Sequence, residues 1–311
     1  MKTVLVIGGC GFIGSHIVDQ LQRQGLAVRV LSRRPETFRE PVPGVDYVLG
    51  SMADDDLLDV ALEGVDAVIH TASSMVPQTS NLKPVADITE NLISSVQLFQ
   101  KMKAAGVGKL VFLSSGGTVY GIPRQSPLAE DHPLRPISSY GVVKVAIENY
   151  IQMFSSLHGL EACILRPSNP YGPRQGRTGL QGVIGVYLSK IARNEPLEVW
   201  GDGTVIRDFI YVEDLAELCV LAIRSPINGV FNAGSGLGVS IGEIIDLLAR
   251  MLGRDFDLIH KQARNFDVPA NVLDISKVMR TLNWSPKTSL EVGIQSTWQW
   301  IQHIENVSQV P

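Results

Sequence analysis

The sequence predicts an α/β fold in which a doubly wound parallel sheet carries a smaller C-terminal lobe. Short, continuously apolar runs alternate with helical patterns through the first half of the chain, which is the rhythm of strand–helix–strand units in a parallel sheet. A glycine-rich turn, "IGGCGFIG", joins the first apolar run to the first helical pattern. From about residue 167 the texture changes to Pro and Gly clusters and separate helices. We therefore expect a second, less contiguous lobe there.

The apolar runs are short enough to be strands buried on both faces of the sheet. In chain order they are "TVLVIG" (3–8), "AVRVLS" (27–32), "VDYVL" (45–49), "DAVIHTA" (66–72) and "KLVFLSS" (109–115). Residues 13–25 repeat apolar side chains at helical spacing and stop at Gly25, a good helix C-terminus. We expect the sheet domain to span residues 1–166, with some later segments returning to it, and the smaller lobe to span mainly 167–311.

The composition argues against several classes of protein. The 311 residues are 45% apolar and 19% charged, which is ordinary for a globular protein. A net charge of −4 and scattered Lys and Arg give no basic surface for nucleic acid. Cys10, Cys163 and Cys219 lie far apart without CxxC spacing, so no disulfide or metal site is expected. No apolar run suits a signal peptide or a membrane span, so we expect a cytoplasmic protein without a membrane partner.

The glycine-rich turn predicts a dinucleotide site. Glycines at a strand-to-helix turn let backbone N–H groups and the positive helix N-terminus approach a pyrophosphate. A bare tight turn would also carry glycines, but this one follows the first strand and opens an amphipathic helix. A spacing of GxxGxxG begins at Gly8, and one of GxGxxG begins at Gly9. The residues expected to contact the cofactor in this turn are Gly8, Gly11, Phe12, Ile13 and Gly14.

The residues at the end of the second predicted strand indicate whether the cofactor is NAD or NADP. An acidic residue about twenty positions after the turn would accept the ribose 2′-hydroxyl of NAD. Here the chain has Ser32, Arg33 and Arg34 instead. An arginine pair suits a 2′-phosphate, so NADP is favoured slightly over NAD, although two arginines after a strand could equally form a solvated edge.

A second motif pairs a tyrosine with a lysine. In "SSYGVVKVAIENY", Tyr140 and Lys144 are four residues apart at the start of a predicted helix, so both lie on one face. A nearby ammonium favours phenolate and lowers the pKa of the tyrosine toward the working range of a general acid or base. The pair alone would be an ordinary surface feature. In a chain that also carries the dinucleotide turn, it indicates a catalytic site.

These motifs, in this order, resemble the extended short-chain dehydrogenase/reductases, specifically the NAD(P)-dependent nucleotide-sugar epimerase/dehydratase family typified by UDP-galactose 4-epimerase. The resemblance covers nearly the whole chain. It rests on "GGCGFIGSH", "SSGGTVYG", "YGVVK", "LRPSNPYGPRQ" (165–175), "WGDGTVIRDFIYVEDLA" (200–216), "FNAGSG" (231–236) and "FDVPANVLDISKV" (266–278). It implies a Rossmann-like dinucleotide domain and a C-terminal lobe that closes over a nucleotide sugar.

The resemblance also implies roles for individual residues. Tyr140 is the base, and Lys144 orients the nicotinamide ribose. Further cofactor contacts are implied at Ser51, Met52, Thr71, Ala72 and Ser114. Substrate contacts are implied at Asn169 and Arg207 for the diphosphate, and at Arg264 and Asp267 for the nucleotide end. A structural ion pair of Arg207 with Asp208 or Asp214 is the alternative. Two helices, 91–106 and 140–157, are implied to pair in a homodimer as a four-helix bundle.

One departure from the family concerns the sugar 4-oxygen. Four residues before Tyr120, where most members carry Ser or Thr, this chain has Gly116. If the segment stays extended, Thr118 points the same way as position 116. If the two glycines bend it, Ser115 comes round instead, and this arrangement is slightly favoured because Gly-Gly permits bulging.

The expected reaction follows from these residues. Gly117 and Thr118 stand where the dehydratases carry carboxylates, so dehydration is disfavoured. A 4-epimerase acting on a UDP-hexose or UDP-N-acetylhexosamine through a 4-keto sugar is expected, with an NADPH-dependent 4-ketoreductase as the alternative. A non-catalytic dinucleotide-binding regulator is a remote alternative, because the Tyr/Lys pair is intact. The resemblance also implies that Asn271 matches a position where the family's hexose-only epimerases carry a bulky Tyr that closes the pocket. Asn is shorter, and its amide can donate to an acetamido carbonyl, so an N-acetyl sugar is expected to fit unless Asn271 faces solvent or pairs with backbone.

Overall fold

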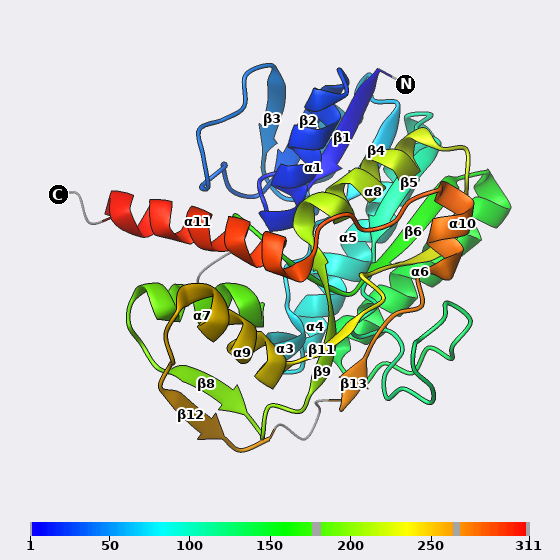
Figure 1. The fold of residues 1–311 in the computed structure, drawn as a ribbon. Helices are drawn as coiled ribbons and strands as arrows, with labels where there is room; N and C mark the ends of the chain where they lie inside the picture. The colour runs from blue at the N-terminus through cyan, green and yellow to red at the C-terminus, as the bar shows by residue number, and fades with distance from the viewer. Residues whose placement is uncertain (1, 176–181, 264–267, 309–311) are drawn as a thin grey trace.

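A parallel sheet of seven strands forms the centre of the molecule (Figure 1). The computed structural model describes residues 2–175, 182–263 and 268–308. The strands lie in the order β10-β6-β5-β4-β1-β2-β3. Their bounds are β1 (Thr3–Ile7), β2 (Ala27–Ser32), β3 (Val45–Leu49), β4 (Ala67–His70), β5 (Lys109–Leu113), β6 (Glu161–Pro167) and β10 (Gly229–Ala233). The order reverses direction at β1, so the crevice between the carboxyl ends of β1 and β4 is the place where such folds bind ligands.

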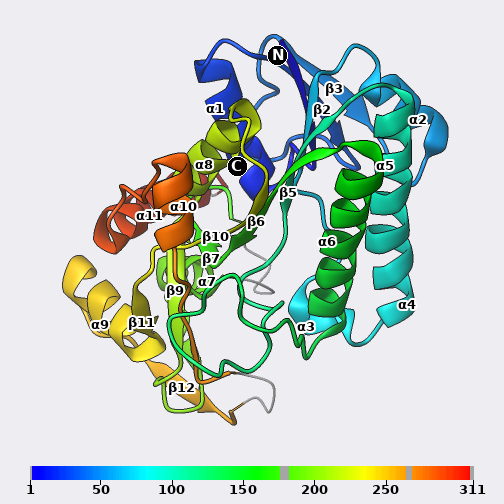
Figure 2. The same cartoon turned by 90° about the vertical axis from the view of Figure 1, so that its right-hand side faces the viewer.

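Helices cover both faces of this sheet. On one face lie α1 (Phe12–Arg23), α8 (Val212–Arg224) and α10 (Ser276–Leu282). On the other lie α2 (Asp55–Leu62), α5 (Ser94–Ala104) and α6 (Ser139–His158), with α5 and α6 side by side (Figure 2). Alternate residues of β1 serve the two faces, since Val4 and Val6 pack with α1 and α8 while Leu5 and Ile7 pack with α2, α5 and α6. The predicted doubly wound α/β fold is confirmed.

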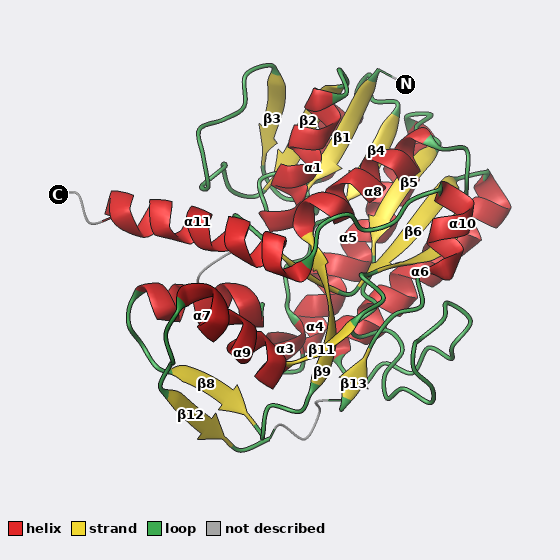
Figure 3. Cartoon of the chain, in the orientation of Figure 1, coloured by secondary structure: helices red, strands yellow, loops and turns green. Residues whose placement is uncertain are grey.

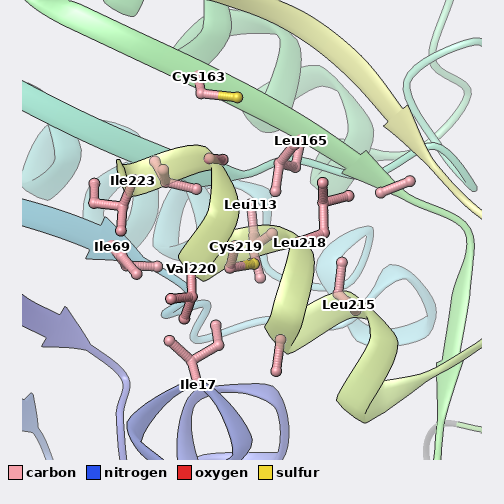
Figure 4. Packing of buried hydrophobic residues seen from close by; sticks show 14 of the residues in the cluster. Ile17, Ile69, Leu113, Cys163, Leu165, Leu215, Leu218, Cys219, Val220 and Ile223 are labelled. Atoms are coloured by element: carbon pink, nitrogen blue, oxygen red, sulfur yellow. The ribbon is translucent and has the colours of Figure 1, made fainter. Parts of the chain in front are cut away.

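The first of these cores joins distant parts of the chain. Figure 4 shows α8 lying across the sheet, with Leu218, Cys219 and Ile223 packed toward β4, β5 and β6. All three cysteines of the chain are buried and free. Together with β10, α8 brings residues 212–233 back to the sheet after the chain has left it at β6.

The second lobe has its own sheet and its own core. Its strands are β7 (Asn169–Tyr171), β8 (Leu197–Trp200), β9 (Ile206–Tyr211), β11 (Gly238–Ser240), β12 (Leu258–Lys261) and β13 (Ala270–Asn271). Strand β9 is central, pairing with β7, β11 and β13, while β8 pairs with β12. Its helices are α7 (Val183–Ala192), α9 (Ile241–Leu252) and α11 (Leu290–Ser308), shown in red around these strands in Figure 3. Tyr171, Ile184, Leu248 and Ile294 belong to the apolar core between them.

A short helical run leads from the sheet into α5. It consists of α3 (Pro77–Ser80), α4 (Pro84–Asp87) and the π-helical segment η1 (Ile88–Ile93). The helix expected over 91–106 is therefore split between η1 and α5. None of the described helices is long and apolar enough to cross a bilayer. Within the described part of the chain, no cluster of three or more His, Cys, Asp or Glu could hold a metal ion.

Candidate active site

The glycine turn forms a tight cradle at the carboxyl end of β1. Gly8 has a φ of +83°, and a Cβ there would lie 2.8 Å from Thr71 Oγ1 and 3.0 Å from the backbone of Ala72. A Cβ on Gly14 would lie 2.1 Å from the carbonyl oxygen of Gly8. The turn, α1 and the end of β4 therefore approach one another only because these side chains are missing. No side chain caps the N-terminus of α1 at Gly11, so the cradle fits a dinucleotide pyrophosphate.

The neighbouring strand ends hold the other expected cofactor residues. Ser32 is buried, and its hydroxyl accepts a hydrogen bond of 3.1 Å from the backbone N–H of Cys10, which ties the turn to β2. Arg33 is exposed, with its guanidinium 3.8 Å from the Glu90 carboxylate, and Arg34 is exposed. Ser51 accepts a hydrogen bond from the N–H of the residue two positions on. The Met52 side chain is buried in the core beneath α2.

Tyr140 and Lys144 lie together at the start of α6. Ser138 caps this helix by accepting a hydrogen bond of 3.2 Å from the Gly141 N–H. Lys144 Nζ donates to the carbonyl oxygen of Leu113 at 2.8 Å and lies 5.6 Å from the centre of the Tyr140 ring. Strand β5 thus holds the ammonium one turn from the phenol.

Burial dominates the titration of this pair. Burial lowers the pKa of Lys144 to about 8, although Glu148 and Asp87 oppose it. Burial, aided by Asp87, raises the pKa of Tyr140 to about 12. The expectation that the lysine lowers the tyrosine pKa is wrong for the protein alone. The loss of water around the phenol outweighs an ammonium that is bonded to the Leu113 carbonyl.

The segment after β5 is a turn rather than an extension of the strand. The N–H groups of Thr118 and Val119 both donate to the Ser115 carbonyl oxygen, at 3.3 and 3.2 Å. The arrangement in which Thr118 shares a face with position 116 is therefore wrong, because the two glycines close the backbone on itself. The Ser114 hydroxyl donates to the Glu148 carboxylate. The Ser114 hydroxyl is thus hydrogen-bonded inside the protein.

Sequence reasoning missed the buried ion pair behind Lys144. Glu148, one turn further along α6, accepts hydrogen bonds from Arg166 Nε at 3.0 Å and Nη2 at 2.6 Å. Arg166 also donates to the hydroxyl of Tyr120 at 3.0 Å. Both charged side chains are almost completely buried. The signal was a glutamate four residues after Lys144 on the same helix face, opposite an arginine that ends the apolar run of β6.

A second cluster that the sequence did not reveal joins α1 to the loop after β7. Asp19 pairs with Arg39 and, at 2.7 Å, with Arg174 of the "NPYGPRQ" motif. His16 bonds the Pro173 carbonyl at 2.9 Å, and Arg174 lies 2.9 Å from its other ring nitrogen. Burial and the arginine charge lower the pKa of His16 to about 3, so the ring is neutral. The ion pairs and hydrogen bonds of this cluster connect the loop after β7, in the second lobe, to α1.

The expected substrate residues that the structure describes lie on adjacent strands. Asn169 on β7 donates to the Asp208 carbonyl oxygen at 2.8 Å. Arg207 on β9 donates to the carbonyls of Ile206 and Val268, both at 2.8 Å. Asn271 on β13 is paired with Arg207 in the register of the sheet. Arg264 and Asp267 lie outside the described residues.

Asn271 faces the turn after β5 rather than solvent. It is 2% exposed, and its Nδ2 donates to the Gly116 carbonyl at 3.3 Å. Its Oδ1 is buried and has no partner among the described residues. The alternative that Asn271 pairs with backbone is therefore what the structure contains. This bond uses one of the two N–H groups of the Asn271 amide.

Known proteins share both the fold and its motifs. The NAD dependent epimerase/dehydratase family matches residues 4–234, which include the cradle and the Tyr140–Lys144 pair. A protein of Methanocaldococcus jannaschii named putative UDP-glucose 4-epimerase is 35% identical over 96% of this chain and 98% of its own. The dTDP-4-dehydro-6-deoxyglucose reductase of Escherichia coli is 33% identical over 94% and 95%.

Solved structures agree closely with this chain. The UDP-glucose 4-epimerase of Thermotoga maritima, solved with UDP-glucose, is 33% identical with a TM-score of 0.94, covering 98% of this chain and all of that one. The Thermus thermophilus UDP-glucose 4-epimerase with NAD reaches 0.91 at 34% identity, over 97% and 99%. The UDP-N-acetylglucosamine 4-epimerase of Methanobrevibacter ruminantium, with UDP-N-acetylmuramic acid, reaches 0.92 at 30%, over 98% and 99%. The expected preference for NADP finds no support here. This chain belongs to the NAD-dependent epimerase/dehydratase family.

Proposed function

We propose that the protein is an NAD-dependent nucleotide-sugar 4-epimerase that acts on a UDP-hexose or a UDP-N-acetylhexosamine. The observation that carries this proposal is the Tyr140–Lys144 pair on α6, held by β5 at the same sheet edge as the glycine cradle. An acid/base beside a dinucleotide suits the oxidation and reduction of a carbinol carbon. The relatives and neighbours with UDP-glucose and UDP-N-acetylglucosamine activities support the substrate class.

In this proposal the protein moves a proton while the cofactor handles the hydride. NAD held in the glycine cradle of Gly8, Gly11 and Gly14 would supply the hydride acceptor and donor for C4 of the sugar. Tyr140 accepts the proton of the 4-hydroxyl as the 4-keto sugar forms. After the 4-keto sugar has rotated in the site, Tyr140 returns the proton to the 4-oxygen. Lys144 donates one of its three N–H groups to the Leu113 carbonyl oxygen. The other two N–H groups can donate to the hydroxyls of a ribose. Its ammonium favours the phenolate against the burial that raises the tyrosine pKa.

The second lobe supplies the proposed substrate contacts. Asn169, Arg207 and Asn271 stand on neighbouring strands, and Arg207 suits phosphate oxygens because its guanidinium forks. We propose that N-acetylated sugars are accepted, because Asn271 is shorter than the tyrosine that closes the pocket in the family's hexose-only epimerases. An Asn271→Tyr variant should lose kcat/KM for UDP-N-acetylglucosamine selectively. Equal losses on UDP-glucose would show instead that Asn271 only supports the turn.

The test of the function is direct. Purified protein is denatured and its released small molecules are identified by mass spectrometry, and native protein is then assayed for interconversion of UDP-glucose and UDP-galactose without added cofactor. We expect released NAD and turnover. Arg33 and Arg34 are exposed at the end of β2, so released NADP would assign them to the 2′-phosphate, in accord with the sequence-based preference. Turnover that requires added NADPH would contradict an epimerase.

A 4-ketoreductase is the second candidate. The Escherichia coli reductase, similar along nearly its whole length, favours it. The two functions differ in cofactor balance. A reductase consumes one NADPH for each 4-keto sugar reduced, whereas an epimerase ends with its cofactor unchanged. Absorbance at 340 nm during turnover separates them.

We further propose a homodimer formed through α5 and α6. Helix α6 exposes Val142, Met153 and Leu157, and the segment η1 that leads into α5 exposes Ile93. A hollow of about 590 Å³ lies between them, lined by Val96, Gln100, Lys103, Ala104, Tyr150, Met153, Phe154 and His158. A second copy packed as a four-helix bundle, as the family resemblance implies, would cover this face.

A further inference from the structure

The carboxylate of Asp87 is completely buried where α4 meets the π-helical segment η1. Its Oδ1 accepts a hydrogen bond of 2.9 Å from Nδ2 of Asn91, and its Oδ2 accepts one of 2.8 Å from the hydroxyl of Ser139. A buried charge is costly unless hydrogen bonds satisfy it, and here each oxygen has a neutral donor.

Asn91 connects Asp87 to the loop after β4. Its Nδ2 also donates to the Ser74 hydroxyl, and its Oδ1 accepts from the Ser74 N–H, each at 2.9 Å. Ser74 lies two residues after Ala72, whose backbone is 3.0 Å from where a Cβ on Gly8 would be. π-Helical turns such as η1 are rare and are frequently found at functional sites. A continuous set of hydrogen bonds therefore runs from the glycine-cradle side of the site to Asp87.

The same network reaches the N-terminus of α6. Ser139 and Tyr140 are the first two residues of this helix, so their backbone N–H groups have no partner within it. The N–H of Ser139 donates to Asn81 Oδ1 at 2.8 Å, and that of Tyr140 donates to Ser80 Oγ at 3.1 Å. Asp87 adds the bond to the Ser139 hydroxyl. Three neighbouring side chains thus fix the backbone that carries Tyr140.

Asp87 also acts on the Tyr140–Lys144 pair through its charge. In the described part of the chain, Asp87 and Lys144 are the charged groups that face Tyr140. After burial, Asp87 is the second cause that raises the pKa of Tyr140 to about 12, and it favours the ammonium of Lys144. The other carboxylates on α6 and on the segments packed against its start pair with arginines, Glu90 with Arg33 and Glu148 with Arg166.

We propose that Asp87 is a positioning residue for Tyr140: its hydrogen bond to Ser139 holds the start of α6, and its negative charge opposes the effect of the Lys144 ammonium on the phenol. This inference rests on the proposed reaction, in which Tyr140 accepts the proton of the 4-hydroxyl and later returns it. A group that does both works best when neither of its forms is strongly favoured. Lys144 favours the phenolate and Asp87 favours the phenol, so the two charges together set the pH at which Tyr140 changes form.

The pH dependence of kcat tests the charge. With UDP-glucose, kcat should fall on the acid side as Tyr140 becomes protonated. Asp87→Asn keeps the shape of the side chain and removes its charge, so this acid limb should move to lower pH by about one unit. Ser139→Ala breaks the hydrogen bond but keeps the charge, and Glu90→Gln removes the exposed carboxylate of η1. Both should leave the limb within about 0.3 unit of the wild type. An unmoved limb in Asp87→Asn, or an equal shift in Ser139→Ala, would overturn the proposal.

Unfolding tests the hydrogen bond without any activity. Asp87→Ala and Ser139→Ala should each lower Tm, and the double variant should lose less than the sum of the two, because both changes break the same bond. Additive losses would overturn the role of Asp87 in holding the start of α6. Should Asp87→Ala fail to fold, the pH profiles of Asp87→Asn and Ser139→Ala still decide.

Failure of the proposed function gives a different result. A wild type that does not turn over UDP-glucose would refute the epimerase, and the variants would then be compared in NADPH-dependent reduction of dTDP-4-dehydro-6-deoxyglucose. In that reaction Tyr140 donates its proton, so the rate falls on the alkaline side. Asp87→Asn should move this alkaline limb to lower pH, and an unmoved limb would refute the role of Asp87 independently.

Discussion

Tyr140 sits in surroundings that disfavour its reactive form. Burial and Asp87 raise its pKa to about 12, so the protein alone holds a neutral phenol, and catalysis requires added positive charge. Tyr140→Phe should lower kcat about 10²–10⁴-fold because the proton has no carrier. Dinucleotide content should stay unchanged, since the ring still packs against Lys144. Both are measured on one preparation, and a variant that retains more than half of the activity would contradict the role.

The lowered pKa of Lys144 predicts how the free energy of unfolding depends on pH. Its pKa falls from the ordinary 10.5 to about 8 in the folded protein. Between these values the unfolded chain binds more protons than the native state, so this residue's contribution to stability rises with pH from about 8 to 10.5 and is flat below. The difference in unfolding free energy between wild type and Lys144→Met should grow by on the order of 1–3 kcal/mol across that window. Urea titrations at a series of pH values measure it, and a difference that shrinks would contradict the assignment.

At the scale of elements, the Glu148–Arg166 pair locks α6 to β6. Removing one partner of a buried pair leaves an unpaired charge, so Glu148→Met should cost about 3–5 kcal/mol of stability. Replacing both residues with methionine should recover much of this loss. Lys101→Met, which breaks the ion pair with Asp59 on exposed surface, is the matched control and should matter far less. Urea unfolding of the four proteins decides, and equal costs would contradict the argument.

The sequence predicted the strands better than their contacts. The predicted runs 27–32 and 45–49 coincide with β2 and β3. Burial on both faces, expected for every run, is wrong for β3, because β3 is an edge strand of the sheet and its residues are only partly buried or exposed. The run 109–115 ends two residues early, at Leu113, since two serines and two glycines can form either a strand or a turn. The glycine cradle and the Tyr140–Lys144 pair could be predicted because the residues of each lie close together in the sequence. Asn271 lies 155 residues from its partner Gly116, and no local pattern encodes such a contact.

At the scale of the whole molecule, the apolar face of α5 and α6 predicts assembly. Met153→Glu places a charge in that face and should convert a dimer to monomers. Met279→Glu on α10 is the matched control, because Met279 is similarly exposed, at 44% against 39%, but lies outside that face. Sedimentation velocity at micromolar concentration measures both. A wild type that is monomeric there would contradict the proposed dimer.

The support of the turn after β5 by Asn271 also bears on the order in which the protein matures on the ribosome. The cradle, Tyr140 and Lys144 are all synthesised in the first half of the chain, whereas the strand that braces Gly116 comes near its end. A nascent chain can therefore form the glycine cradle proposed to bind a dinucleotide well before it forms the packing around the proposed sugar site. A chain that terminates just before β13 should therefore bind the dinucleotide but fail to catalyse the proposed reaction.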